Sequence, residues 1–307
     1  MRIVMLEPVA VSAGVLKALA APLIKQGHEL VICQEKVSEE EAKEADADVF
    51  IIANSPLKGE VIRANKNLKL ISVAFTGIDH VDLAACRERG IEIRNAAGYC
   101  TNAVAELTFA HILSVLRKVA DCDGQVRRGG TKAGLIGHEL YGKTLGIVGT
   151  GAIGTRVAEI GGIFGCRLLG YNRTEHEEAR HLGVRYVGLE QLMSESDIIT
   201  LHTPLTEETR LLIDREKIAL MKKEAILINM ARGGVVDSTA LAQALTDGKI
   251  AGAGIDVFET EPPIVPEHPL LHAPGVLLTP HVAFATEESM LRRAGITMNN
   301  IISWMGL

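Results

Sequence analysis

Several classes of protein are excluded by what this 307-residue sequence does not contain. It has no excess of basic residues, because 32 Lys and Arg and 38 Asp and Glu give a formal net charge of -6. Proteins that bind nucleic acids or anionic membranes need a basic surface, so neither partner is expected. No apolar stretch approaches the roughly 20 residues of a membrane-spanning helix, and the first apolar run is too short for a secretory signal. The sequence therefore predicts a cytoplasmic protein.

Cysteine is also scarce, and its pattern excludes the usual cysteine-based sites. The number is odd and no CxxC pair occurs among Cys33, Cys86, Cys100, Cys122 and Cys166. Disulfides and a metal site are therefore not expected. Most of these residues are expected to be small, buried hydrophobic groups. Cys100 differs because it falls at an expected junction between domains.

What the chain does contain is an alternation of short apolar runs and longer amphipathic segments. The runs are continuously hydrophobic, which is typical of parallel strands covered by helices on both faces. Strands are expected at Arg2–Leu6, Glu29–Ile32, Val49–Ala53, Leu70–Ala74, Ile91–Arg94, Leu145–Val148, Leu168–Tyr171, Ile198–Leu201, Ala225–Asn229, Gly252–Val257 and Val276–Thr279. The predicted fold class is α/β, with two doubly wound parallel-sheet domains that meet near Gly98.

Helices are expected between these strands. In the first third they are predicted at Val11–Gly27, Ser38–Ala45, Lys58–Asn65 and Val81–Arg89. A longer helical pattern runs from Thr101, which suits a capping position, to Cys122. The glycine-rich, polar stretch Gly124–Gly142 is expected to be a loop, and Thr286–Trp304 a final helix.

A glycine-rich turn follows the strand at Leu145–Val148. The sequence is Gly149-Thr-Gly151-Ala-Ile-Gly154, and a helix to about Phe164 comes next. In dinucleotide-binding folds these glycines permit a tight turn, a close backbone approach to the pyrophosphate and close packing of helix on strand. The helix N-terminus presents N–H groups to the phosphates. The pattern favours a dinucleotide site, and a methyltransferase is the nearest alternative with a similar turn.

The end of the next strand indicates which dinucleotide is bound. An NAD site usually has Asp or Glu there for the ribose 2′-hydroxyl, whereas this chain reads Asn172-Arg173-Thr174. Loss of the carboxylate removes repulsion toward a 2′-phosphate, and a guanidinium can pair with that phosphate. NADP(H) is therefore favoured over NAD(H). In the alternative interpretation, Arg173 stacks on the adenine or points into water.

Three polar residues follow separate apolar strands in the second half: Arg232, Glu261 and His281. Ligands of doubly wound sheets bind outside the carboxyl ends of the strands, so the three side chains are candidates to converge. Each alone could be a solvated loop residue. His202 also follows a strand, in Leu201-His-Thr-Pro204, and is the rival of His281 among ten histidines.

With these motifs, in this order, the chain resembles the D-isomer-specific 2-hydroxyacid dehydrogenase family over nearly its whole length. The resemblance implies a flavodoxin-like substrate domain formed by residues 1–98 and 282–307, and an inserted Rossmann domain at residues 99–281. Arg232 would bind the substrate carboxylate and polarise the carbonyl. His281 would donate the proton, and Glu261 would orient the imidazole. Asp256 would accept a hydrogen bond from the nicotinamide carboxamide.

The resemblance also implies the remaining contacts. Backbone amides near Thr76 and Gly77 would bind the substrate carboxylate, and the cofactor would supply the hydride chemistry. The expected cofactor contacts are Gly149, Gly151, Ala152, Ile153, Gly154, Asn172, Arg173, Thr174, His202, Thr203, Pro204, Thr209, Met230, Ala231 and Asp256. The side chains considered as substrate lining are Asn54, Ser55, Phe75, Tyr99 and Phe284.

The function implied is hydride transfer between NADP(H), or alternatively NAD(H), and a small 2-oxo or 2-hydroxy acid, by a homodimer that uses helices such as Thr101–Cys122. Phosphoglycerate dehydrogenases usually carry an Arg where this chain reads Ala53–Leu57, and many carry a regulatory domain beyond the position of Leu307. Both departures count against a phosphorylated substrate. Phosphoglycerate dehydrogenase activity and a dinucleotide-sensing, corepressor-like interaction protein are the alternatives.

Overall fold

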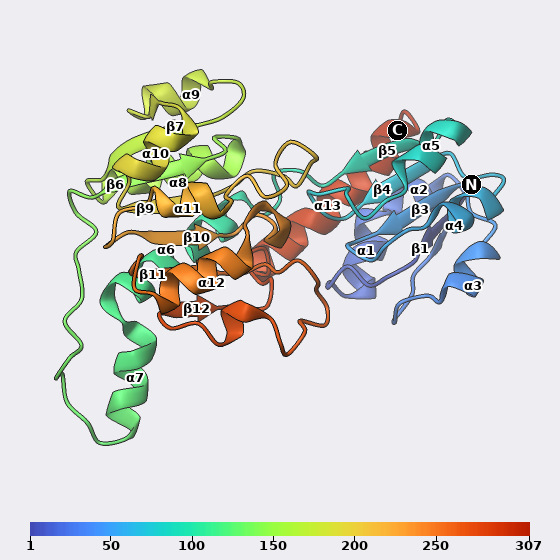
Figure 1. Ribbon diagram of the computed structural model, residues 1–307. Coiled ribbons are helices and arrows are strands. Elements are labelled where there is room, and N and C mark those ends of the chain that lie inside the picture. Colours follow the sequence, from blue (N-terminus) through green and yellow to red (C-terminus); the bar gives the residue numbers. More distant parts are fainter. The chain divides into compact units, whose positions relative to one another are not determined.

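The computed structural model describes residues 1–307, which form two compact units (Figure 1). The terminal unit consists of Met1–Cys100 and Ala285–Leu307, and the central unit of Thr101–Phe284. The central unit is therefore an insertion in the chain of the terminal unit. No helix combines the length and the apolar character that crossing a membrane requires.

The terminal unit is built on a five-stranded sheet in which every pairing is parallel. The strand order is β2-β1-β3-β4-β5, and β3 and β4 are buried along their whole length. The strands are β1 (Arg2–Met5), β2 (Glu29–Val31), β3 (Val49–Ile52), β4 (Leu70–Val73) and β5 (Glu92–Asn95). The helices are α1 (Ala13–Leu19), α2 (Ala21–Lys25), α3 (Glu39–Lys43), α4 (Gly59–Ala64), α5 (Leu83–Arg89) and α13 (Glu287–Trp304).

The last helix of the chain completes the core of this first sheet. Met298 and Ile301 of α13 lie in one apolar cluster with Leu16 of α1 and the side chains of β1 and β3. The Ser72 hydroxyl of β4 donates to the carbonyl oxygen of Thr297 at 3.0 Å. The start of the chain and its end therefore share one hydrophobic core.

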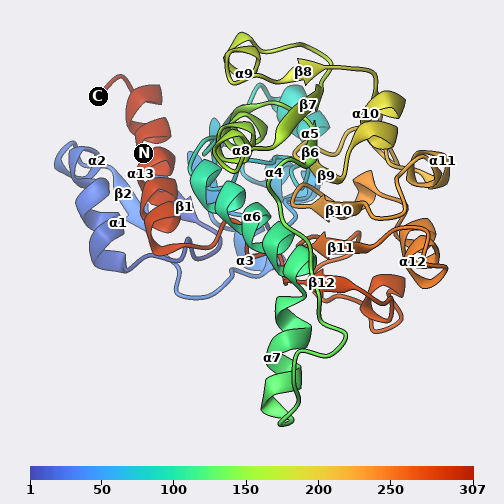
Figure 2. The same ribbon diagram turned by 90° about the vertical axis from the view of Figure 1, so that its left-hand side faces the viewer.

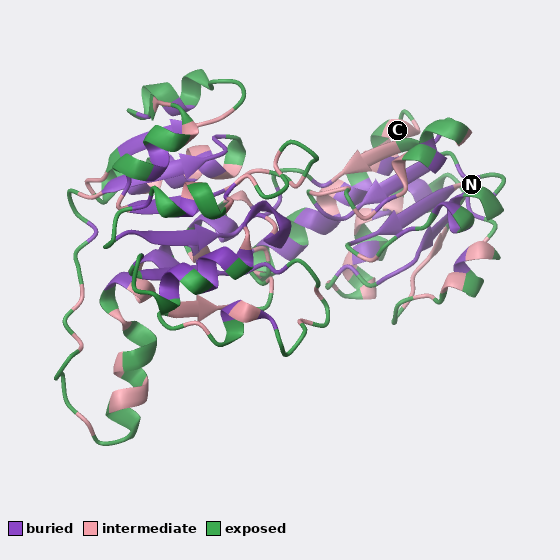
Figure 3. Cartoon of the chain, in the orientation of Figure 1, coloured by how far each residue is buried: buried purple, intermediate pink, exposed green.

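The central unit contains a seven-stranded parallel sheet with the order β12-β11-β10-β9-β6-β7-β8. Figure 3 shows that its strands are largely buried. They are β6 (Thr144–Val148), β7 (Arg167–Tyr171), β8 (Arg185–Tyr186), β9 (Ile198–Leu201), β10 (Ile226–Asn229), β11 (Gly252–Ile255) and β12 (Val276–Leu278). The winding reverses between β6 and β9, which is where open α/β sheets bind their ligands.

Helices cover both faces of the central sheet. Figure 2 shows α6 (Thr101–Arg117) and α8 (Ala152–Ile163) packed side by side, with α6 against β10, β11 and β12. The remaining helical segments are α7 (Val119–Arg127), α9 (Glu177–His181), α10 (Leu189–Glu195), α11 (Arg215–Ala219), α12 (Ser238–Thr246), η1 (Gly233–Val235) and η2 (Pro269–Leu271). The prediction of two parallel-sheet α/β domains is confirmed.

Some local predictions were wrong. The helix expected at Val11–Gly27 is split at Ala20, because Pro22 in the first turn of α2 has no N–H to continue the preceding helix. The helix expected at Thr101–Cys122 breaks at Lys118, which has a left-handed φ of +53°. Helix α7 then runs through Gly124 into the expected loop and buries none of its residues.

Candidate active site

The glycine turn after β6 is closely packed at its first and last glycines and open at the middle one. A Cβ on Gly149 would lie 2.7 Å from the His202 carbonyl oxygen, and one on Gly154 would lie 1.9 Å from the Gly149 carbonyl oxygen. A Cβ on Gly151 would meet nothing within 4 Å, so this glycine borders open space. Gly151 is also the N-cap of α8 and makes no side-chain capping bond. The first N–H groups of α8 can therefore bind a phosphate.

Asn172, Arg173 and Thr174 lie beside this turn, at the end of β7. The Gly149 N–H donates to the Tyr171 carbonyl oxygen at 2.8 Å, which ties the turn to the strand. The Tyr186 hydroxyl lies 2.7 Å from Thr150 Oγ1 and accepts from the His176 N–H at 3.0 Å. The Arg173 side chain is exposed. The segment after β7 is thus fixed next to the glycine turn.

The segment after β9, which contains His202, Thr203 and Pro204, is engaged in internal hydrogen bonds. His202 Nε2 lies 2.9 Å from the Thr200 hydroxyl, and its buried Nδ1 has no partner. Burial lowers the pKa of His202 to about 3, so the ring is neutral near pH 7. Thr209 donates its hydroxyl to the Pro204 carbonyl oxygen at 2.6 Å and so braces the turn. His202 is therefore poorly suited to donate a proton.

His281 and Glu261 form a close pair. His281 Nδ1 lies 2.6 Å from Glu261 Oε1, and the side chains are 22% and 18% exposed. The second oxygen of Glu261 accepts from the Phe258 N–H at 3.0 Å, which fixes the carboxylate. The imidazole also meets the ring of Phe284 edge-on, with centroids 5.6 Å apart. The pair offers an oriented imidazole that can exchange a proton.

Arg232 lies on the strand end next to the segment that carries Glu261. The buried side chain of Asn229 donates to the Arg232 carbonyl oxygen at 3.0 Å and accepts from the Ala231 N–H at 3.0 Å. The guanidinium donates to the Ala231 carbonyl oxygen at 2.8 Å. A Cβ on Gly233 would lie 2.1 Å from the Phe258 carbonyl carbon, so the two loops touch through their backbones. Glycine is required at this contact.

The carboxylate of Asp256, at the end of β11, is buried among three donors. It accepts from the Thr279 hydroxyl at 2.5 Å and from the N–H groups of Val282 and Ala283, each at 2.9 Å. Burial raises the pKa of this carboxyl above its usual value, although the three hydrogen bonds oppose the shift. These contacts are made to the segment of His281, and the sequence contained no signal for them.

In the terminal unit, Thr76 and Gly77 follow β4 and have backbone amides suited to an anion. The Asn95 side chain donates to the Thr76 carbonyl oxygen at 2.6 Å and fixes this turn. The amide N–H groups of Thr76 and Gly77 have no acceptor among the hydrogen bonds of the structure. Both groups are therefore available to a carboxylate.

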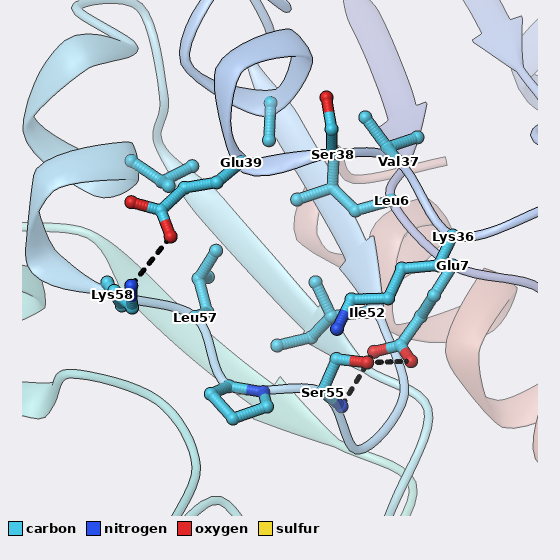
Figure 4. A pocket seen from close by; sticks show the side chains of 13 residues that line it. Leu6, Glu7, Lys36, Val37, Ser38, Glu39, Ile52, Ser55, Leu57 and Lys58 are labelled. Atoms are coloured by element: carbon cyan, nitrogen blue, oxygen red, sulfur yellow. Dashed lines mark hydrogen bonds and ion pairs between the residues drawn. The ribbon is translucent and has the colours of Figure 1, made fainter.

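A cavity of about 240 Å³ lies at the carboxyl ends of β1 and β3 in the same unit (Figure 4). The Glu7 carboxylate on its wall accepts from the N–H groups of Ala53 and Ser55, at 2.6 and 3.0 Å, and from the Ser55 hydroxyl at 2.8 Å. Lys58 pairs with Glu39 at 2.7 Å on the opposite wall. Ser55 is thus committed to Glu7, which braces the turn that carries Asn54.

A family model matches most of the central unit. The model described as "D-isomer specific 2-hydroxyacid dehydrogenase, NAD binding domain" matches residues 109–283. The chain belongs to this family. Its members are nicotinamide-dependent oxidoreductases that interconvert 2-hydroxy and 2-oxo acids, and the predictions of family, enzyme class and hydride-transfer activity are confirmed.

Several named relatives of this dehydrogenase cover most of its length. A glyoxylate reductase of Korarchaeum cryptofilum is 42% identical over 88% of this chain and 82% of its own. A hydroxypyruvate reductase of Thermotoga maritima is 38% identical over 91% of this chain and 92% of its own. A D-3-phosphoglycerate dehydrogenase of Methanocaldococcus jannaschii is 41% identical, but the match spans 49% of that protein.

Solved structures extend the similarity to the whole dehydrogenase chain. The acyclic imino acid reductase Bsp5, in complex with NADPH and D-Arg, has a TM-score of 0.90 and 28% identity and covers 100% of this chain and 97% of its own. The D-lactate dehydrogenase of Aquifex aeolicus, in complex with NAD and lactic acid, has a TM-score of 0.86 and 31% identity over 100% and 96% of the two chains. Both nicotinamide dinucleotides thus occur among proteins of this fold.

Proposed function

We propose that this dehydrogenase reduces a small 2-oxo acid of the size of glyoxylate or hydroxypyruvate, with Arg232, Glu261 and His281 as its reactive side chains. The observation that carries this proposal is the 2.6 Å contact between His281 Nδ1 and Glu261 Oε1 beside the loop of Arg232. A bound nicotinamide ring supplies the hydride for the carbonyl carbon. His281 delivers the proton to the carbonyl oxygen, and in oxidation it takes the proton back.

The other residues of the site bind and orient the substrate. The guanidinium of Arg232 pairs with the substrate carboxylate and draws charge from the carbonyl. Glu261 holds the imidazole in a fixed orientation. The amides of Thr76 and Gly77 bind the same carboxylate from the terminal unit. In this scheme residues 1–98 and 282–307 form the substrate domain, and residues 99–281 form the dinucleotide domain.

For the cofactor we propose NADP(H), with NAD(H) as the weaker ligand. The support is the neutral Asn172 at the end of β7 and the exposed guanidinium of Arg173. The residues that would contact the dinucleotide are Gly149, Gly151, Ala152, Ile153, Gly154, Asn172, Arg173, Thr174, His202, Thr203, Pro204, Thr209, Met230, Ala231 and Asp256. The open space at Gly151 and the uncapped start of α8 would suit its pyrophosphate.

We further propose that the enzyme is a cytoplasmic homodimer. Helix α7 and the segment after it form an arm that extends away from the central sheet (Figure 1). No residue of α7 is buried. Val126, Ile136 and Tyr141 are 71%, 87% and 78% exposed along this arm. Several large, exposed apolar side chains close together in one segment are typical of a surface that binds another protein chain. Light scattering of wild type and an Ile136→Asp variant tests this, because a dimer should dissociate in the variant.

The test of the proposed function is a panel of 2-oxo acids assayed with NADPH and NADH. Steady turnover of glyoxylate or hydroxypyruvate that is lost in His281→Ala supports it. Turnover confined to 3-phosphohydroxypyruvate would favour phosphoglycerate dehydrogenase activity instead. Tight dinucleotide binding with no turnover of any acid would favour the sensing protein. Each result thus selects one function.

A further inference from the structure

We infer that His111 of helix α6 is a positioning residue for His281 and acts through Thr279 and Asp256. This inference depends on the proposed role of His281 as proton donor. The four side chains all belong to the central unit, and the contact between His111 and Thr279 joins residues that are 168 positions apart.

The first observation is the backbone of His281 itself. Its φ of +52° lies in the left-handed region, which is unfavourable for a residue with a Cβ. Such a conformation persists only where the surroundings hold it. The His281 N–H donates to the Asp256 carbonyl oxygen at 2.7 Å, and the next two amides, of Val282 and Ala283, converge on the Asp256 carboxylate. Asp256 therefore fixes the turn that aims the imidazole.

The orientation of that carboxylate is set by Thr279. The Thr279 hydroxyl donates to Asp256 Oδ1 at 2.5 Å, and the same oxygen receives the Val282 N–H. A hydroxyl has one hydrogen, so Thr279 must act as acceptor toward its other neighbour, His111 Nε2, at 3.1 Å. The ring of His111 therefore carries its proton on Nε2.

The surroundings of His111 agree with this tautomer. Its Nδ1 is buried and has no hydrogen-bond partner. A buried nitrogen in this position is better as an unprotonated acceptor than as an N–H group that lacks an acceptor. Burial lowers the pKa of His111 to about 4, so the ring is neutral near pH 7. A Cβ on Gly254 of β11 would lie 2.8 Å from His111 Nδ1, and so this glycine makes room for the ring. The imidazole is thereby held against the strand that ends in Asp256.

The test removes the Thr279 hydroxyl and then restores it. We expect Thr279→Val to lower kcat about 10-fold or more, since displacements of about 1 Å at a reacting group have effects of this order. Thr279→Ser should recover most of kcat, because it restores the donor to Asp256. Thr108→Val is the matched control, since this buried hydroxyl of α6 donates only within its own helix, to Val104.

His111 is tested in the same way with two variants. His111→Leu removes the donor and should lower kcat about threefold to tenfold. His111→Gln offers an N–H group at a similar reach and should restore much of that loss. Equal kcat values in the Leu and Gln variants would overturn the role of His111.

A readout independent of turnover separates this inference from the proposed function. Amide hydrogen exchange of the peptide that spans residues 281–284 should accelerate about 10-fold or more in Thr279→Val and remain unchanged in Thr108→Val. Unchanged exchange in Thr279→Val, or a Thr279→Ser variant as impaired as Thr279→Val, would overturn the inference. A wild-type enzyme without turnover of any 2-oxo acid would refute the proposed function alone.

Discussion

Two histidines follow strands of the same sheet, and their surroundings give them opposite properties. His202, after β9, is half-buried, has its ring 2.9 Å from the Thr200 hydroxyl, and has its pKa lowered to about 3 by desolvation. His281, after β12, is 22% exposed and lies 2.6 Å from a carboxylate. The sequence places both at strand ends, where active-site residues are common. The partner of the ring, rather than its position on the fold, decides which histidine can donate a proton.

The contrast between His202 and His281 is tested by removing each imidazole in turn. We expect His281→Ala to lower kcat about 10³-fold or more, the usual contribution of a general acid. His202→Asn should retain kcat within about 10-fold, because its neutral ring takes no part in proton transfer. Steady-state assays with the best 2-oxo acid measure both values. A larger loss in His202→Asn than in His281→Ala would reverse the assignment.

The carboxylate that distinguishes His281 is tested by Glu261→Gln. We expect kcat to fall about 10²-fold, since the imidazole loses its orienting partner. An unchanged kcat in Glu261→Gln would show that the carboxylate does not orient the proton donor.

A smaller effect, on KM for the cofactor, is expected for Arg173, which follows β7. Arg173→Ala should raise KM for NADPH about 10-fold more than KM for NADH, because only NADPH carries the 2′-phosphate that the guanidinium would pair with. Arg180→Ala is a control for loss of one nearby positive charge, since Arg180 packs over the Tyr186 ring. Equal increases for both cofactors in Arg173→Ala would eliminate the 2′-phosphate argument.

The smallest expected effect concerns stability and pH. The pKa of His202 is about 3 in the folded protein against a reference value of 6.5, so between these values the unfolded chain binds a proton that the folded chain does not. The free energy of unfolding should therefore fall as pH drops through this range. His202→Asn should lose about 2 kcal/mol less than wild type between about pH 7 and about pH 5. Urea unfolding at both pH values measures the difference, and equal losses would contradict it.

The features that sequence predicted well are those encoded by neighbouring residues. The turn from Gly149 to Gly154 follows its strand directly. The strands β9 and β10 are mostly apolar and buried along their whole length, because both faces of the sheet are covered. Strand β8 was missed because two residues, Arg185 and Tyr186, carry no periodicity.

The features that sequence did not predict depend on contacts between distant segments. The helix break at Lys118 has no proline or glycine to mark it, and it separates the buried α6 from the exposed α7. The hydrogen bond between His111 and Thr279 joins residues that no local pattern links. The side chain of Asn229, which holds the backbone of Arg232, was not predicted either. Its only signal in the sequence is an amide at the end of the otherwise apolar strand Ile226–Asn229. Tertiary packing, rather than propensity, decides such cases.

The place of α13 in the core of the terminal unit has a consequence for how the chain folds during translation. The first hundred residues leave the ribosome without Met298 and Ile301, which complete their hydrophobic core. The central unit is contiguous in sequence and can acquire its whole sheet earlier. The segment synthesised first therefore finishes folding last, once the C-terminal helix has been released.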